Sequence, residues 1–142
     1  MAALLGGCLE RFAPDVGPLA SASADGAGCP GDSDPAHAVS YRTDLELGVF
    51  ERGKCNNCHT GNGSGTNQSG LDLDTYSSLR TGGGRSGTAI VVDGDACGSI
   101  LVQKIEASPP FGRRMPYNGP PYLSSQDIVL VRDWIAEGAR DN

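Results

Sequence analysis

The sequence is poor in aromatic side chains and in positive charge. Phe, Trp and Tyr make up 6% of its 142 residues, whereas Gly alone contributes 21. So little aromatic volume gives a thin hydrophobic core for one domain of this length. Asp and Glu number 17 against 11 Lys and Arg, so the net charge is −6. Nucleic acid, which requires a basic face, is not expected as a partner, whereas an acidic surface suits docking to a basic one.

Long hydrophobic runs are also missing, and no stretch approaches the roughly twenty apolar residues of a membrane-spanning helix. Residues 9–40 are rich in Ala, Ser, Gly, Asp and Pro. Such a segment contains too little apolar surface to fold alone. We therefore interpret residues 8–40 as a flexible tether and expect the folded domain to cover residues 41–142.

One feature near the N-terminus points to a membrane surface. Residues 5–8 read L-G-G-C, which is similar to the end of a bacterial lipoprotein signal, where a small residue precedes the acylated cysteine. The preceding residues lack Lys and Arg and are too few for a complete signal. We interpret residues 1–7 as the remnant of a truncated signal and Cys8 as the lipid-carrying residue. An accidental similarity is the alternative.

The strongest functional signal lies at residues 55–59, which read C-N-N-C-H. C-x-x-C-H is the attachment signature of a c-type haem. Two thiols at this spacing reach two neighbouring vinyl groups, and the following histidine can ligate the iron. We therefore expect one covalently attached haem c, held by Cys55 and Cys58 with His59 as an axial ligand. A buried haem would also account for the thin core.

Other uses of this motif fit the sequence less well. A structural zinc site needs further Cys or His ligands at a suitable spacing, and the other cysteines are scattered singly. A thioredoxin-like dithiol needs a βαβ context, which the flanking residues do not provide. A disulfide between the two motif cysteines remains an alternative, but it leaves His59 without a role.

Cys29 and Cys97 are a candidate disulfide. Haem attachment of this kind occurs outside the cytoplasm, so we expect the protein in an extracytoplasmic compartment, the bacterial periplasm, where disulfides persist. Two unpaired thiols are the alternative, which an oxidising compartment disfavours.

Met115 is the candidate for the second axial ligand. It is the only methionine besides Met1 and is followed by a proline, which stiffens the loop. A thioether is a soft ligand that suits haem iron. Without a haem the same side chain would be interpreted as packing. The neighbouring Arg113 and Arg114 are candidates for contacts with the haem propionates, with solvated loop arginines as the alternative.

Capping signals and apolar spacing predict four helices. They are expected at 44–53, at about 74–79, at about 97–106 and from Ser124 to about Gly138, where glycine suits the C-terminal end. Residues 60–70, rich in Gly, Ser and Asn, are expected to form a loop. Trp134 in the last helix is expected to pack against the haem periphery or against the first helix.

The order of these elements resembles class I cytochromes c. It is similar in particular to bacterial mono-haem cytochrome c domains in which Gly-Gly precedes an apolar run, Ser-x-Leu and Met-Pro follow, and the chain ends in Trp-Ile-x-x-Gly-Ala. The corresponding segments here are 82–83, 99–101, 115–116 and 134–139. The resemblance implies a mostly α, cytochrome c-like fold with long Gly-rich loops, in which the N- and C-terminal helices cross beside one haem. It also implies His59 and Met115 as the axial ligands.

This combination predicts a one-electron carrier between extracytoplasmic redox partners rather than an enzyme. A haem-bearing accessory subunit of a larger membrane oxidoreductase complex is one alternative. A haem enzyme or sensor with an open sixth site for peroxide or a small gas is another. The ferric absorption band of methionine–iron bonding, a general haem property, distinguishes the carrier from the enzyme.

Overall fold

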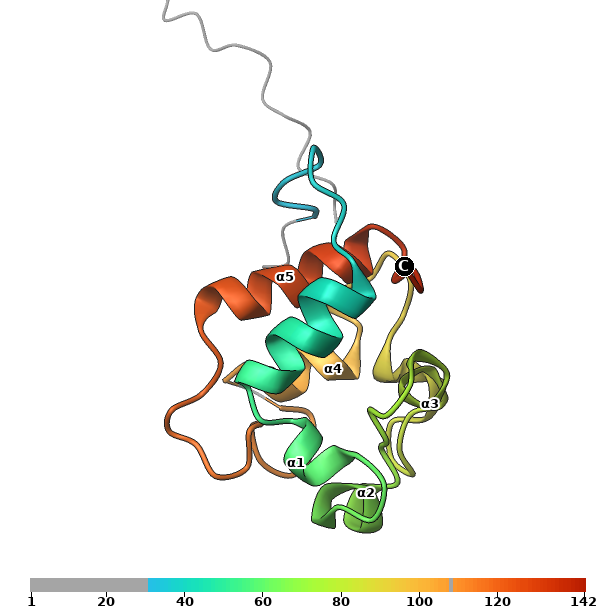
Figure 1. Cartoon of the computed structure of the whole chain (residues 1–142), viewed down its shortest axis with the longest axis vertical. Helices are drawn as coiled ribbons and strands as arrows, with labels where there is room; N and C mark the ends of the chain where they lie inside the picture. The colour runs from blue at the N-terminus through green and yellow to red at the C-terminus, as the bar shows by residue number, and fades with distance from the viewer. Residues whose placement is uncertain (1–30, 108) are drawn as a thin grey trace, which may run out of the picture.

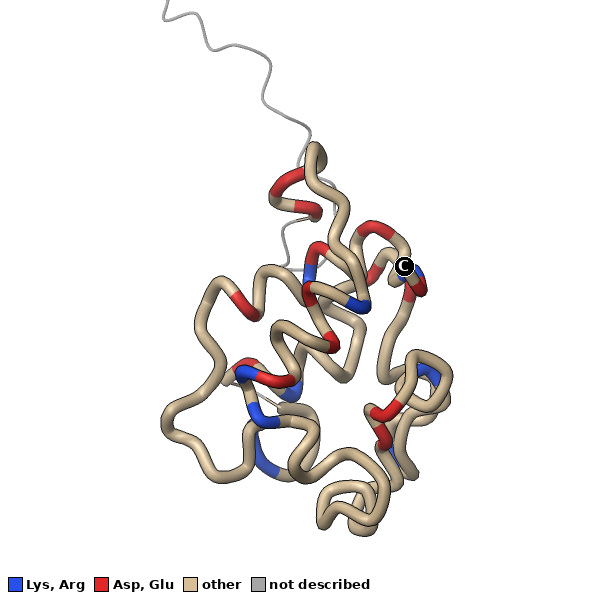
Figure 2. The backbone as a smooth tube through the Cα atoms, viewed as in Figure 1, with Lys and Arg blue, Asp and Glu red and all other residues tan. Residues whose placement is uncertain are grey.

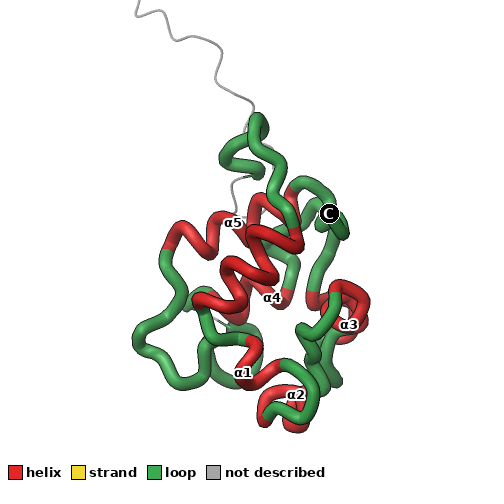
Figure 3. The backbone as a smooth tube through the Cα atoms, in the orientation of Figure 1, coloured by secondary structure: helices red, strands yellow, loops and turns green. Residues whose placement is uncertain are grey.

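The computed structural model describes residues 31–107 and 109–142 of the chain. In this part the protein is mostly helical, as predicted, and it contains no strand (Figures 1 and 3). The elements in chain order are η1 (Tyr41–Phe50), α1 (Asn56–His59), α2 (Ser64–Ser69), α3 (Tyr76–Thr81), η2 (Gly87–Ile90), α4 (Ile100–Ile105) and α5 (Ser125–Ala136). No helix of the described residues combines the length and apolar character needed to cross a membrane.

The first helix, η1, begins earlier than the predicted residue 44. Ser40 is its N-cap, because its hydroxyl accepts a hydrogen bond from the amide of Thr43. The amide of Leu45 lies 3.3 Å from the carbonyl oxygen of Ser40, five residues back, which is the hydrogen-bond spacing of a π-helix. Leu45 and Val49 are completely buried on the inner face of η1.

The last helix, α5, agrees closely with the predicted one. The Ser124 hydroxyl caps it by accepting a hydrogen bond from the amide of Asp127 at 3.1 Å. Gly138, with a φ of 98°, follows its C-terminal end, where the left-handed region favours glycine. In Figure 1 η1 crosses in front of α5. This helix pair is the N- and C-terminal crossing that the predicted fold requires.

Aromatic rings join the two crossing helices. The ring centroids of Tyr41 in η1 and Trp134 in α5 lie 5.6 Å apart, and Tyr76 of α3 contacts Tyr41 at 5.2 Å. The indole N–H donates to the carbonyl of Arg140 at 2.9 Å, which satisfies the one polar group of the buried Trp134. The structure therefore places Trp134 against the first helix, the second of its two expected positions.

The last residues of the predicted tether are attached to the domain. The amide of Ser33 donates to the buried carboxylate of Asp133 in α5 at 3.0 Å. The amide of Val39 donates to the carboxylate of Glu137 at 2.9 Å. Contacts with the folded domain thus begin before residue 41, at a segment whose composition gave no sign of them.

Residues 60–70 contain a helix where we expected only a loop. Ser64–Ser69 form α2, which packs against α1. A side-chain hydrogen bond within this short helix stabilises it, because the hydroxyl of Ser69 donates to the carbonyl of Gly65 at 2.7 Å. Glycine permits the close approach to α1, since a Cβ at position 63 would lie 2.3 Å from the carbonyl oxygen of Cys58. Tertiary packing therefore overrides the low helix propensity of this segment.

Candidate haem site

One apolar cavity collects the residues singled out by the sequence. Its volume is about 410 Å³, within the range of small-molecule and cofactor sites. Cys55, His59 and Met115 all line it. The apolar wall is formed by aliphatic side chains from η1, η2, α4, α5 and the intervening loops, namely Val49, Leu71, Leu73, Ile90, Ile100, Leu101, Ile105, Leu123 and Val131.

The two motif cysteines lie at the beginning and in the first turn of α1. The amide of Cys55 donates to the carbonyl of Phe50 at 2.8 Å, which connects α1 to the end of η1. Cys55 is half-buried and Cys58 is exposed, and both are free thiols. Burial raises the pKa of the Cys55 thiol to about 11. Of the two free thiols, Cys55 lines the apolar cavity, whereas Cys58 is exposed one turn further along and is not part of the lining.

His59 is oriented by the segment that follows α2. Its Nδ1 lies 3.1 Å from the carbonyl oxygen of Leu71. The ring edge formed by Cε1 and Nε2 lies against Gly65, where a Cβ would be 2.8 Å from both atoms. A hydrogen bond at Nδ1 leaves the lone pair on Nε2 available to a metal, a common arrangement for ligating histidines.

Met115 reaches the same cavity from the loop between α4 and α5. Its amide donates to the carbonyl of Lys104 at 2.7 Å, and its side chain is half-buried against the core. A soft thioether and an imidazole on the wall of one apolar cavity form the donor set of a His/Met haem. The residues present therefore fit a haem c.

The charged residues of this cavity are all basic. Arg85, Lys104 and Arg113 line it, together with no Asp or Glu. Arg85 and Lys104 lie 4.8 and 5.1 Å from the centroid of the Phe111 ring. Burial, assisted by the charge of Arg85, lowers the pKa of Lys104. Cations without acidic neighbours at an apolar cavity suit the propionate groups of a haem.

Of these three cations, Arg113 was singled out from the sequence, whereas Arg85 and Lys104 were not considered. Arg113 was a predicted propionate contact and lines the cavity, whereas Arg114 does not. The Arg114 guanidinium donates to the carbonyl of Ile105 at 2.9 Å and covers the ring of Tyr122. The one available signal for Lys104 was its i, i+4 relationship to the apolar Ile100 on the same helix, since both line the cavity.

The other singled-out cysteines stand apart from this site. Cys8 and Cys29 lie outside the described residues. Cys97 is not a free thiol in the structure. The Cys29–Cys97 disulfide and the lipidation of Cys8 therefore stay predictions. Elsewhere in residues 31–107 and 109–142, no group of three or more His, Cys, Asp and Glu side chains is placed to hold a metal ion.

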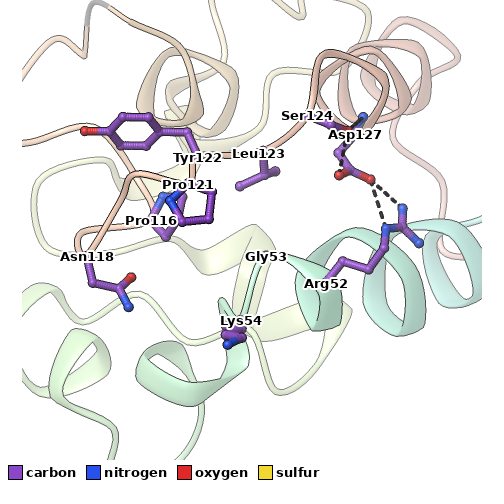
Figure 4. Close-up of a pocket in the computed structure, with 10 residues that line it drawn as sticks. All are labelled: Arg52, Gly53, Lys54, Pro116, Asn118, Pro121, Tyr122, Leu123, Ser124 and Asp127. Carbon is purple, nitrogen blue, oxygen red and sulfur yellow. Dashed lines mark hydrogen bonds and ion pairs between the residues drawn. The ribbon is translucent and has the colours of Figure 1, made fainter.

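A second cavity of about 310 Å³ separates the end of η1 from the Met115 loop. Figure 4 shows Arg52 of the helix end directed at Asp127 of α5, with Lys54, Pro116 and Tyr122 around the opening. The Arg52 guanidinium donates to Asp127 at 2.5 Å. This ion pair closes one side of the cavity and joins the chain just before the motif to the start of α5.

Comparison with known proteins agrees with this geometry. Residues 55–118 match the family model described as Planctomycete cytochrome C. The matched segment is less than half of the chain, but it contains the C-x-x-C-H motif and Met115. No curated protein and no solved structure matches the chain significantly. The match and the all-α fold together support a cytochrome c-like domain of the kind that binds haem c covalently and carries electrons.

Proposed function

We propose that this protein is a one-electron carrier with a single haem c, attached through Cys55 and Cys58 and ligated by His59 and Met115. The observation that carries the proposal is the convergence of the C-x-x-C-H turn and Met115 on one apolar cavity. Bound haem supplies an iron couple that exchanges a single electron between the ferrous and ferric states.

The chain's own residues would favour electron transfer over catalysis. With a haem bound, His59 and Met115 would both ligate the iron and would leave no position open for peroxide or a small gas. Methionine ligation raises the reduction potential above that of a bis-His haem in a similar site. The aliphatic wall of the cavity excludes water, which also raises the reduction potential.

The proposed partner is an acidic redox protein, which differs from the basic partner suggested by net charge. Between Glu106 and Asp127 the chain carries two arginines and no acidic residue. Figure 2 shows basic segments at the end of η1 and on the loop before α5, whereas acidic segments prevail on residues 31–40 and near the C-terminus. The charge beside the cavity, rather than the total charge, directs a docking partner.

The composition of this loop also suits a docking surface. Tyr117 and Tyr122 are 64% and 40% exposed. The Arg113 guanidinium lies 5.1 Å from the centroid of the Tyr117 ring, and Arg114 lies 4.2 Å from that of Tyr122. Tyrosine and arginine are among the side chains most enriched at the energetic centres of protein interfaces.

Haem attachment of this type places the protein outside the cytoplasm. A lipid at Cys8 would add a membrane anchor, and an anchored carrier would exchange electrons with a membrane oxidoreductase complex. An accessory subunit of that complex would co-purify with it after detergent extraction, whereas a carrier would be recovered as a separate protein.

Mass spectrometry and optical spectroscopy of the purified protein test the proposal. We expect a mass increase of one haem, lost when Cys55 and Cys58 are both changed to Ser. The ferric protein should be low-spin and show the methionine–iron absorption band, which Met115→Ala removes. A high-spin spectrum that this substitution leaves unchanged would mean that Met115 only packs, and would favour a haem enzyme.

A further inference from the structure

Lys104 contacts the loop that carries Met115 at three points. Its carbonyl oxygen accepts a hydrogen bond from the Met115 amide at 2.7 Å. Its ammonium donates to the carbonyls of Phe111 and Arg113 at 2.8 and 2.5 Å. One residue of α4 therefore holds the loop at the methionine itself and at two positions preceding it.

Few other polar contacts hold this loop. In the described part of residues 107–123, the amide of Met115 is the only backbone donor that bonds to the backbone of another element. Arg114 adds a side-chain bond to the carbonyl of Ile105 on α4. The remaining backbone hydrogen bond of the segment, from Gly119 to Pro116, is internal to it. The position of Met115 relative to the cavity therefore depends strongly on α4.

The surroundings of the Lys104 ammonium indicate a specific role. The residue is half-buried, lines the cavity and forms no ion pair among the described residues. Its positive charge is satisfied by backbone carbonyls, which also draws the loop against α4. A lysine that only maintained solubility would extend into water, because burying an ammonium costs free energy.

We propose that Lys104 is a positioning residue that holds Met115 in place for iron ligation. This inference rests on the proposed His59/Met115 ligation and assigns the residue that maintains it. Loss of the ammonium leaves the carbonyls of Phe111 and Arg113 without their donor. The loop then moves more freely, and added ligands compete with Met115 for the iron more effectively.

Binding of imidazole to the ferric protein measures how firmly Met115 is held. Lys104→Met keeps an apolar stem along the cavity wall but removes the donors. It should raise the imidazole affinity at least about tenfold, equivalent to about 1.4 kcal/mol, and weaken the methionine–iron band. Lys104→Gln, shorter and polar, should act in the same direction. Lys104→Arg, which keeps cationic donors, should recover most of the wild-type affinity.

Arg85→Met is the matched control for charge. It removes one positive charge from the same cavity but no hydrogen bond to the loop backbone. It should lower the reduction potential while the methionine band persists. An increase in imidazole affinity equal to that of Lys104→Met would assign the effect to charge or to the contact that both side chains make with the Phe111 ring, and would overturn the proposal.

Two further results separate the inference from the function on which it rests. Wild-type imidazole affinity in both Lys104→Met and Lys104→Gln, with the methionine band intact, overturns the positioning role but leaves the carrier function standing. A wild-type protein without the methionine band refutes Met115 ligation itself and the inference with it. Far-ultraviolet circular dichroism of each variant confirms that its helices are formed.

Discussion

The carbonyl oxygen of Leu71 lies 3.1 Å from Nδ1 of His59. A carbonyl oxygen only accepts hydrogen bonds, so Nδ1 is the donor, and the neutral imidazole in this tautomer has its lone pair on Nε2. Two residues after Leu71, the amide of Leu73 donates to the carbonyl of His59 at 2.6 Å. The segment after α2 therefore fixes both the backbone and the ring of the motif histidine.

Gly65→Ala should disturb this arrangement. Its Cβ would lie 2.8 Å from Cε1 and Nε2 of His59 and 2.9 Å from the carbonyl oxygen of Cys58. Either the imidazole turns or α2 moves away from α1. We expect a lower yield of haem-loaded protein and a shifted reduction potential, measured by haem absorbance per protein and by redox titration. Ser64→Ala, an exposed neighbour on the same helix, should match the wild type; equal losses in both variants would contradict the explanation.

Arg85→Gln should lower the reduction potential more than Arg114→Gln. Both substitutions remove one positive charge, but of these two residues Arg85 alone lines the cavity. A nearby positive charge disfavours the ferric state, so its loss lowers the potential. Because Arg85 is exposed, water and salt screen its charge. We therefore expect the reduction potential to shift by less than about 60 mV, which corresponds to a tenfold change in the equilibrium constant of a one-electron couple. Redox titration at low ionic strength measures both variants, and a larger shift in Arg114→Gln would refute the cavity assignment.

Salt should slow oxidation of the ferrous protein by hexacyanoferrate(III), although both carry net negative charge. The net charge of −6 predicts repulsion and acceleration by salt, whereas the basic residues beside the cavity predict local attraction. Stopped-flow kinetics at increasing ionic strength decide between them. Lys54→Glu, which replaces a positive charge at the second cavity by a negative one, should reverse or flatten the salt dependence of the rate. Arg42→Glu, the same charge change at the other end of η1, should have a smaller effect.

Asp127→Asn should destabilise the protein at neutral pH but not in acid. Burial alone would raise the pKa of Asp127, yet the hydrogen bonds from Arg52 and Ser124 outweigh it and lower the pKa. A carboxylate whose pKa is lower in the folded state stabilises that state above its unfolded pKa of about 3.9, and this stabilisation is lost as pH falls.

The Arg52 side chain is 56% exposed, so its ion pair with Asp127 is screened by water. We therefore expect the free energy of unfolding of the wild type to exceed that of Asp127→Asn by about 1 kcal/mol or less. Urea denaturation of the wild type and of Asp127→Asn at pH 7 and pH 3 measures it. The difference between the two proteins should be present at pH 7 and shrink at pH 3. A constant difference would assign the effect to helix capping rather than to the charge.

Signals that are local in the sequence predicted local structure well. Ser124 caps α5 and Gly138 follows its end as expected, because a capping hydrogen bond and a left-handed turn involve residues only a few positions apart. The haem motif is equally local, since the chemistry of two thiols and a histidine depends only on their spacing. The Met115 hypothesis needed just one further assumption, that the loop returns to the same cavity.

Tertiary structure decided what depends on contacts between distant segments. The loop expected at 60–70 forms α2, because glycines allow it to pack on α1. Arg113 and Arg114 are equivalent in the sequence, but one lines the cavity and the other lies over Tyr122. Lys104 was not distinguishable as the residue that holds the Met115 loop. Burial, charge pairing and close approach are properties of residues brought together by folding, so no local pattern encodes them.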